Sequence, residues 1–178
     1  MKSKELSRLV KLGALAAMAV VAAGLLQFPI LAAAPYLKYD PADVALLIGG
    51  FAFGPWWGLA LVAVTAALQE LVFGGAGGWI GALMHFLASG TLVVVSALLY
   101  RRSKSFKRAI LALVCGAAAM TVVMIPLNLI FTPLYTGRAV SEVMPLILPA
   151  ILPFNAIKAF GNALITFLLY KRVRGLLR

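Results

Sequence analysis

Two apolar stretches of this chain, residues 12–34 and 109–131, are each long enough to cross a lipid bilayer, and neither contains a charged residue. An apolar run longer than about 18 residues favours a transmembrane helix. The composition agrees, with 63% hydrophobic and 12% charged residues, whereas a soluble domain has about 25% charged residues. We therefore predict an all-α integral membrane bundle in the cell membrane that forms one domain over residues 1–178. The first stretch exceeds the roughly 7–15 apolar residues of a signal peptide, so we expect it to be retained.

The basic residues lie beside the apolar stretches. The net charge is +11, from 16 Lys and Arg against 5 Asp and Glu, and most of the basic residues fall within 2–11, 101–108 and 171–178. Lys and Arg next to membrane spans mark cytoplasmic ends. The charge distribution therefore predicts that the N- and C-termini are cytoplasmic, and it does not indicate nucleic-acid binding.

If all three basic clusters are cytoplasmic, the chain crosses the membrane an even number of times between them. The arrangement that we favour has six spans, at residues 12–32, 44–53, 56–73, 79–100, 109–131 and 146–170. The polar outer loops are then 35–43, 74–78 and 132–145, so a ligand site should open outward.

Segment 44–53 is the weakest of these spans. As a helix it is about 15 Å long, against a hydrocarbon core of about 30 Å. It either extends through Pro41 or is half-buried in protein, and Gly54-Pro55 separates it from the next span. A re-entrant pair of 44–53 and 56–73 that never reaches the cytoplasm is equally consistent with an even number of crossings.

The last predicted span contains a lysine far from either end, Lys158. A lysine inside a span costs roughly 2.5–3.5 kcal/mol on insertion scales and usually faces a bundle interior or a cavity. Asn155, Lys158 and Asn162 share one helical face, and Asn128 in the preceding span is a plausible opposing group. The amides alone fit interhelical hydrogen bonds equally well, and Asn162 is more typical of packing. We predict a polar pocket at Asn128, Asn155 and Lys158.

His85, with Gln69 and Glu70 nearby in sequence, raises the possibility of a metal site or a proton relay. A single histidine without partners at ligand spacing is more typical of a hydrogen-bonded core residue. The sequence contains no P-loop, His-Glu-x-x-His or Gly-x-Ser-x-Gly motif, so we expect no enzyme activity, no metal and no cofactor. Without a nucleotide site the chain cannot drive uphill transport by ATP alone, which points to a binding subunit that takes energy from a partner.

Several short motifs occur in a familiar order: FP at 28–29, YLKYDPAD at 36–43, GGFAFGP at 49–55, Asn128 with TPLY at 132–135, and PFNAIK at 153–158. With six spans and cytoplasmic ends, the chain resembles the substrate-binding S components of energy-coupling factor (ECF) vitamin transporters, and the motifs resemble those of the riboflavin-specific branch. The resemblance implies capture of riboflavin from the extracellular side. The candidate ligand contacts that it implies are Asn128, Asn155 and Lys158, together with Leu37, Tyr39 and Asp40 of a lid-like loop.

The resemblance also implies partners: a transmembrane coupling subunit and two ATP-binding subunits. The family docks its first helix through a small-xxx-small motif, and small residues let helices approach closely. Gly13/Ala17 and Ala19/Ala23 both fit, and we select Gly13 and Ala17 because they lie nearer the cytoplasmic end.

The chain departs from the riboflavin-specific branch at the third and fourth spans. Gln69-Glu70 and 82–85 stand where Lys and Asn are expected. This leaves open an S component for another vitamin or a flavin-related compound. A rival of a different class is a standalone facilitator or a structural membrane protein.

Overall fold

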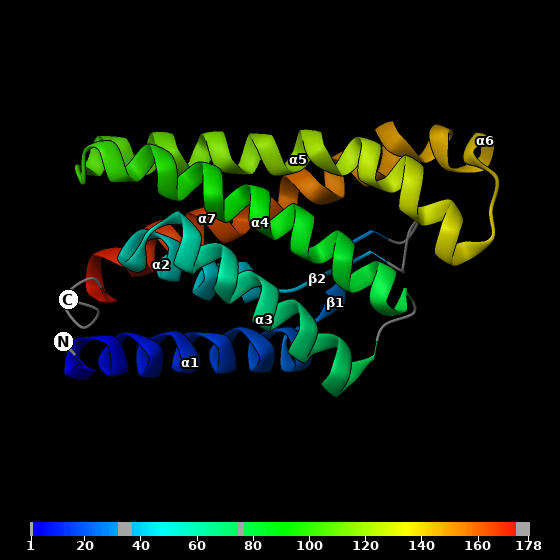
Figure 1. Ribbon diagram of the computed structural model, residues 1–178. Coiled ribbons are helices and arrows are strands. Elements are labelled where there is room, and N and C mark those ends of the chain that lie inside the picture. Colours follow the sequence, from blue (N-terminus) through cyan, green and yellow to red (C-terminus); the bar gives the residue numbers. More distant parts are fainter. Residues whose placement is uncertain (1, 32–36, 75–76, 174–178) are drawn as a thin grey trace.

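The computed structural model describes residues 2–31, 37–74 and 77–173, and long helices packed along their lengths make up most of it (Figure 1). In chain order the elements are α1 (Lys2–Leu25), β1 (Phe28–Pro29), β2 (Lys38–Tyr39), α2 (Ala42–Phe53), α3 (Pro55–Phe73), α4 (Gly78–Arg102), α5 (Phe106–Thr136), α6 (Val140–Val143), a 3-10 turn (Met144–Leu146), a π-helical turn (Ile147–Ile151) and α7 (Leu152–Val173). Among the described residues, five helical segments are long and apolar enough to cross a membrane, and α2 is a shorter apolar helix. The predicted all-α, multi-pass membrane bundle is confirmed.

The first apolar stretch is divided between a helix and a small β-hairpin. α1 ends with the bond from the Leu26 amide to the Ala22 carbonyl, and Phe28 and Pro29 then pair antiparallel with Tyr39 and Lys38. Pro29 has no N–H with which to continue a helix. The predicted bounds 12–32 are therefore wrong at both ends. Hydrophobicity alone does not distinguish a helix from a paired strand, and α1 begins within the basic segment. Residues 35 and 36 of the predicted outer loop lie outside the described residues.

The bounds of the predicted outer loop 132–145 are also wrong. α5 continues through Pro133 to Thr136 and ends at Gly137, whose φ of 71° is left-handed. A proline costs a helix one backbone hydrogen bond, and transmembrane helices tolerate that loss because neighbouring groups replace it. At the end of α5 the Thr136 hydroxyl donates to the Thr132 carbonyl at 2.6 Å. Only three residues then separate α5 from α6, and the chain re-enters the bundle through α6 and the two short turns.

The predicted break at Gly54-Pro55 forms the turn of a helical hairpin. Gly54 has φ 96° and Pro55 is the first residue of α3. Gly50 and Gly58 bring the two helices into backbone contact, since a Cβ on Gly58 would lie 2.8 Å from the Gly50 Cα. The 12 residues of α2 span about 18 Å, short of the roughly 30 Å hydrocarbon core. α2 therefore crosses only part of the bundle, and the β1–β2 hairpin precedes it.

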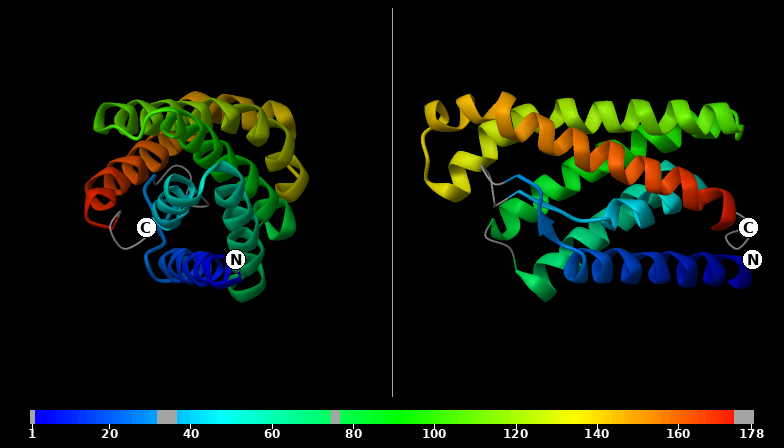
Figure 2. Two further views of the ribbon diagram at one scale, coloured as in Figure 1. Left: turned by 60° about the vertical axis from the view of Figure 1, so that its left-hand side comes forward. Right: turned by 180° about the vertical axis from the view of Figure 1, so that it is seen from behind.

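The described parts of the predicted basic clusters gather at one end of the molecule. The start of α1, the α4–α5 turn and the end of α7 lie together at the left of Figure 1, whereas the end of α3, the start of α4 and the α5–α6 connection lie at the opposite end. The β1–β2 hairpin runs between α1 and α7 in both views of Figure 2. Placing these clusters at one end agrees with the even number of crossings on which the six-span prediction rests.

Candidate functional site

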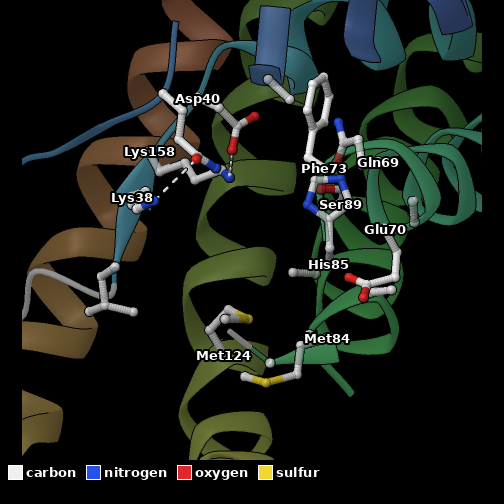
Figure 3. Close-up of a pocket in the computed structure, with 18 of the residues that line it drawn as sticks. Lys38, Asp40, Gln69, Glu70, Phe73, Met84, His85, Ser89, Met124 and Lys158 are labelled. Carbon is white, nitrogen blue, oxygen red and sulfur yellow. Dashed lines mark hydrogen bonds and ion pairs between the residues drawn. The ribbon is translucent and has the colours of Figure 1, made fainter. Parts of the chain in front are cut away.

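A cavity of about 520 Å³ lies inside the bundle, between the β1–β2 hairpin, the end of α3, the start of α4, α5 and the first turns of α7. Its volume falls within the roughly 300–1,000 Å³ typical of small-molecule sites. These segments all lie away from the basic clusters, so the cavity occupies the other half of the bundle. Figure 3 shows side chains from two facing walls.

One wall is built around a buried ion pair. The Lys158 ammonium lies 2.6 Å from Asp40 Oδ2, with side-chain exposures of 9% and 8%. Asp40 Oδ1 also accepts a hydrogen bond from the Ala42 amide at 3.1 Å, which fixes the carboxylate at the start of α2. Burial alone raises the pKa of the Asp40 carboxyl, but the Lys158 ammonium outweighs burial, so that this pKa lies below its ordinary value. The lysine singled out in the sequence is thus inside the bundle and paired.

One helical turn after Lys158, Asn162 connects α7 with the end of the hairpin and the start of α2. Its amide nitrogen donates to the Asp40 carbonyl at 3.0 Å and to Asp43 Oδ2 at 3.2 Å. Its amide oxygen accepts the Tyr39 hydroxyl at 2.7 Å. Ser89 of α4 donates to Asp43 Oδ1 at 2.5 Å. This buried network holds the end of the hairpin against α7 and agrees with the packing role predicted for Asn162.

The structure brings four of the six predicted ligand contacts to the cavity. Leu37, Asp40, Asn155 and Lys158 line it. On α7, the Asn155 amide nitrogen donates to the Ile151 carbonyl at 2.8 Å.

The other two predicted contacts lie beside the cavity lining. The Asn128 amide donates to the Met124 carbonyl at 2.8 Å and accepts the Thr132 hydroxyl at 3.0 Å. The Tyr39 hydroxyl donates to Asn162 Oδ1. Both residues stay predictions as ligand contacts.

In the sequence, Gln69, Glu70 and 82–85 depart from the riboflavin-specific branch, but that departure predicts no ligand contact on this facing wall. Gln69 and Phe73 of α3 and His85 and Ser89 of α4 line it, and each pair has the four-residue spacing that places side chains on one helical face. That spacing could have been read from the sequence, but nothing showed that the two faces meet. Apolar surface completes the cavity, including Met124 of α5. Within the described ranges, no group of three His, Cys, Asp or Glu side chains is placed to hold a metal ion.

Comparison with known proteins identifies the family. A family model described as "ECF transporter, substrate-specific component" matches residues 7–170. The chain belongs to this family. It is therefore a transporter component rather than an enzyme, and a multi-pass protein of the cell membrane, as predicted.

The relatives of this S component include two proteins named as riboflavin transporters. Riboflavin transporter FmnP of Bacillus subtilis (strain 168) is 31% identical over 158 residues, covering 84% of this chain and 83% of that protein. Riboflavin transporter RibU of Staphylococcus aureus (strain TCH60) is 30% identical over 177 residues, covering 96% and 92%. The fold is similar to the solved S component of a bacterial ECF transporter, with a TM-score of 0.84, 30% identity, and coverage of 100% of this chain and 99% of that one. The resemblance drawn from the sequence motifs is confirmed.

Proposed function

We propose that this S component captures riboflavin from the extracellular side, in the cavity between the hairpin and helices α3, α4, α5 and α7, as one substrate-binding domain that performs no reaction. Two relatives are named riboflavin transporters. The observation that carries the proposal to this chain is the α7 wall, where Asn155 and Lys158 stand one helical turn apart, both buried and both lining the cavity.

The α7 wall suits the polar edge of a flavin ring. The imide edge of the isoalloxazine offers carbonyl acceptors and an N–H donor, which a carboxamide such as that of Asn155 matches in pairs. An ammonium group has three donors, so Lys158 keeps its bond to Asp40 and still donates to the ligand. The dimethylbenzene end of the ring is apolar, and Met124 and Phe154 give it an apolar surface.

The hairpin supplies the remaining contacts of the proposed site. Leu37 and Asp40 line the cavity from this side. Asn128 and Tyr39 reach the ligand only if they exchange their present hydrogen bonds for it, and we retain them on the resemblance alone. With the basic clusters in the cytoplasm, the cavity lies in the outer half of the bundle, which supports entry from outside.

The outer face of α1 supports docking on a transmembrane coupling subunit, which with two ATP-binding subunits would drive uptake. Gly13 and Ala17 are exposed, and nothing lies within 4 Å of a Cβ built on Gly13. Ala19 and Ala23 are 0% and 7% exposed and pack inside the bundle. Of the two small-xxx-small motifs, the first is therefore the one that a partner helix can reach.

Riboflavin binding is tested by purifying the protein in detergent and titrating it with riboflavin while following quenching of flavin fluorescence. We expect a yellow protein or saturable quenching, and weakening by roughly 1–3 kcal/mol in Asn155→Ala and Lys158→Ala, because buried ligand groups lose their partners. A colourless protein that leaves flavin fluorescence unchanged would contradict the proposal and favour another vitamin as the substrate.

A further inference from the structure

The cavity wall across from Lys158 carries two polar atoms without a protein partner. Gln69 Nε2 and His85 Nε2 are both buried, and neither makes a hydrogen bond within the described part of the chain. Both residues line the cavity. In Figure 3 they lie together beside Phe73, on the side away from Asp40 and Lys158.

Unpartnered polar groups are costly in a protein interior, and a native fold rarely keeps them without a reason. By contrast, Ser89 of the same wall donates to Asp43, and Lys158 of the opposite wall is paired with Asp40. Gln69 Nε2 and His85 Nε2 on α3 and α4 therefore differ from these groups in having no protein partner in the described residues. A bound ligand is the partner that these two nitrogens lack.

The chemistry of riboflavin identifies the part that meets this wall, and this step rests on the proposed function. Riboflavin has two polar regions, the imide edge of the ring and the hydroxylated ribityl chain on the central nitrogen. If Asn155 and Lys158 take the imide edge, the dimethylbenzene edge cannot satisfy an amide and an imidazole. The ribityl hydroxyls both donate and accept hydrogen bonds, so they can pair with the amide of Gln69 and the imidazole of His85.

We propose that Gln69 and His85 bind the ribityl hydroxyls and determine the specificity of the cavity for a hydroxylated side chain. The charges at the cavity agree with a neutral group there. Lys38, Asp40, Glu70 and Lys158 line it, two cations and two carboxylates. Glu70 lies on the same wall as His85 (Figure 3). Because the positive and negative side chains of the lining balance, we expect this wall to hydrogen-bond a neutral group of the ligand rather than to pair with a charged one.

The test compares riboflavin with lumiflavin, which has the same ring but a methyl group in place of the ribityl chain. Dissociation constants for both ligands are measured by fluorescence quenching in the full-length protein and in Gln69→Leu and His85→Phe, which replace each polar group with an apolar one of similar shape. We expect each variant to bind riboflavin about five- to a hundredfold more weakly, because ribityl hydroxyls lose their partners. Lumiflavin binding should change by less than about twofold.

Thr91→Val is the matched control on α4. The Thr91 hydroxyl donates to the Leu87 carbonyl at 2.7 Å, and Thr91 lies outside the cavity lining, so both affinities should stay unchanged.

The outcomes separate the two proposals. Equal weakening of riboflavin and lumiflavin would place Gln69 and His85 against the ring and overturn the ribityl assignment. Unchanged riboflavin affinity in both variants would overturn it as well. If the unsubstituted protein binds neither flavin, the proposed function fails and the ribityl assignment fails with it.

Discussion

The ion pair between Lys158 and Asp40 allows a quantitative test of what holds the hairpin to α7. Asp40→Asn preserves the shape of the side chain and can still accept the Ala42 amide through its carbonyl oxygen, but it removes the charge that faces Lys158. Lys158→Met removes the other charge and keeps most of the side-chain volume. Each single substitution leaves one buried group without its counter-ion.

The expected size follows from the burial of the pair. Side-chain exposures of 9% and 8% and a separation of 2.6 Å describe a desolvated ion pair. Removing one partner of such a pair typically costs about 3–5 kcal/mol, because the remaining charge is buried and uncompensated. The neighbouring cavity can hydrate that charge, so we expect a loss near 3 kcal/mol. For a chain of this size 1 kcal/mol shifts Tm by about 2–4 °C, which gives a decrease of about 6–12 °C.

The assay is thermal unfolding of the ligand-free protein in detergent, for both single variants and the double variant Asp40→Asn/Lys158→Met. Replacing a whole buried ion pair with uncharged groups is often close to neutral, so the double variant should recover most of the stability lost in either single variant. Lys38→Met is the control, since Lys38 is exposed and its bond to Gln27 is long, at 3.4 Å.

The coupling between the two substitutions decides the outcome. If the losses of the single variants add in the double variant, the two charges do not stabilise each other, and the ion pair does not hold the hairpin in place. A double variant more stable than either single one supports the pair as the element that fixes the hairpin.

Three further predictions concern docking, packing and topology. Gly13→Leu should leave riboflavin binding unchanged but abolish co-purification with the coupling subunit. The control Val21→Leu, at a residue that is also exposed on α1, should retain co-purification. If both variants co-purify, the docking surface is not at Gly13. Gly58→Val should lower Tm by several degrees, because a Cβ there meets the Gly50 backbone at 2.8 Å. The control Gly81→Ala should lower Tm less, because nothing lies within 4 Å of a Cβ at Gly81. An equal decrease of Tm in both variants would contradict backbone contact between α2 and α3. Cys115 is the single cysteine of the sequence. In a background with Cys115→Ala, single cysteines introduced at Ser103 and Arg138 should react with impermeant reagents from opposite sides of the membrane. Labelling from the same side would refute the topology.

The sequence predicted features that depend on local chemistry. Gly54-Pro55 breaks a helix wherever it occurs in an apolar run, and the structure has a helical hairpin there. The three-residue spacing of Asn155 and Lys158 places them on one face whatever surrounds the helix. The point at which α1 ends and β1 begins could not be predicted, because both belong to one continuous apolar run and hydrophobicity does not distinguish a helix from a strand. The end of α5 could not be predicted either, because the helix continues through Pro133.

Long-range pairing explains the rest of what the sequence left open. Lys158 and Asp40 are 118 positions apart in the chain, and no local pattern indicates that they meet. This pairing also changes what the lysine implies. An unpaired lysine inside a span would itself require a ligand to offset its cost, but Asp40 already compensates the charge. A second indication of a ligand, independent of Lys158, comes from Gln69 and His85, whose buried nitrogens have no partner in the described residues. The wall that departs from the family pattern is thus the wall from which ligand specificity is best inferred.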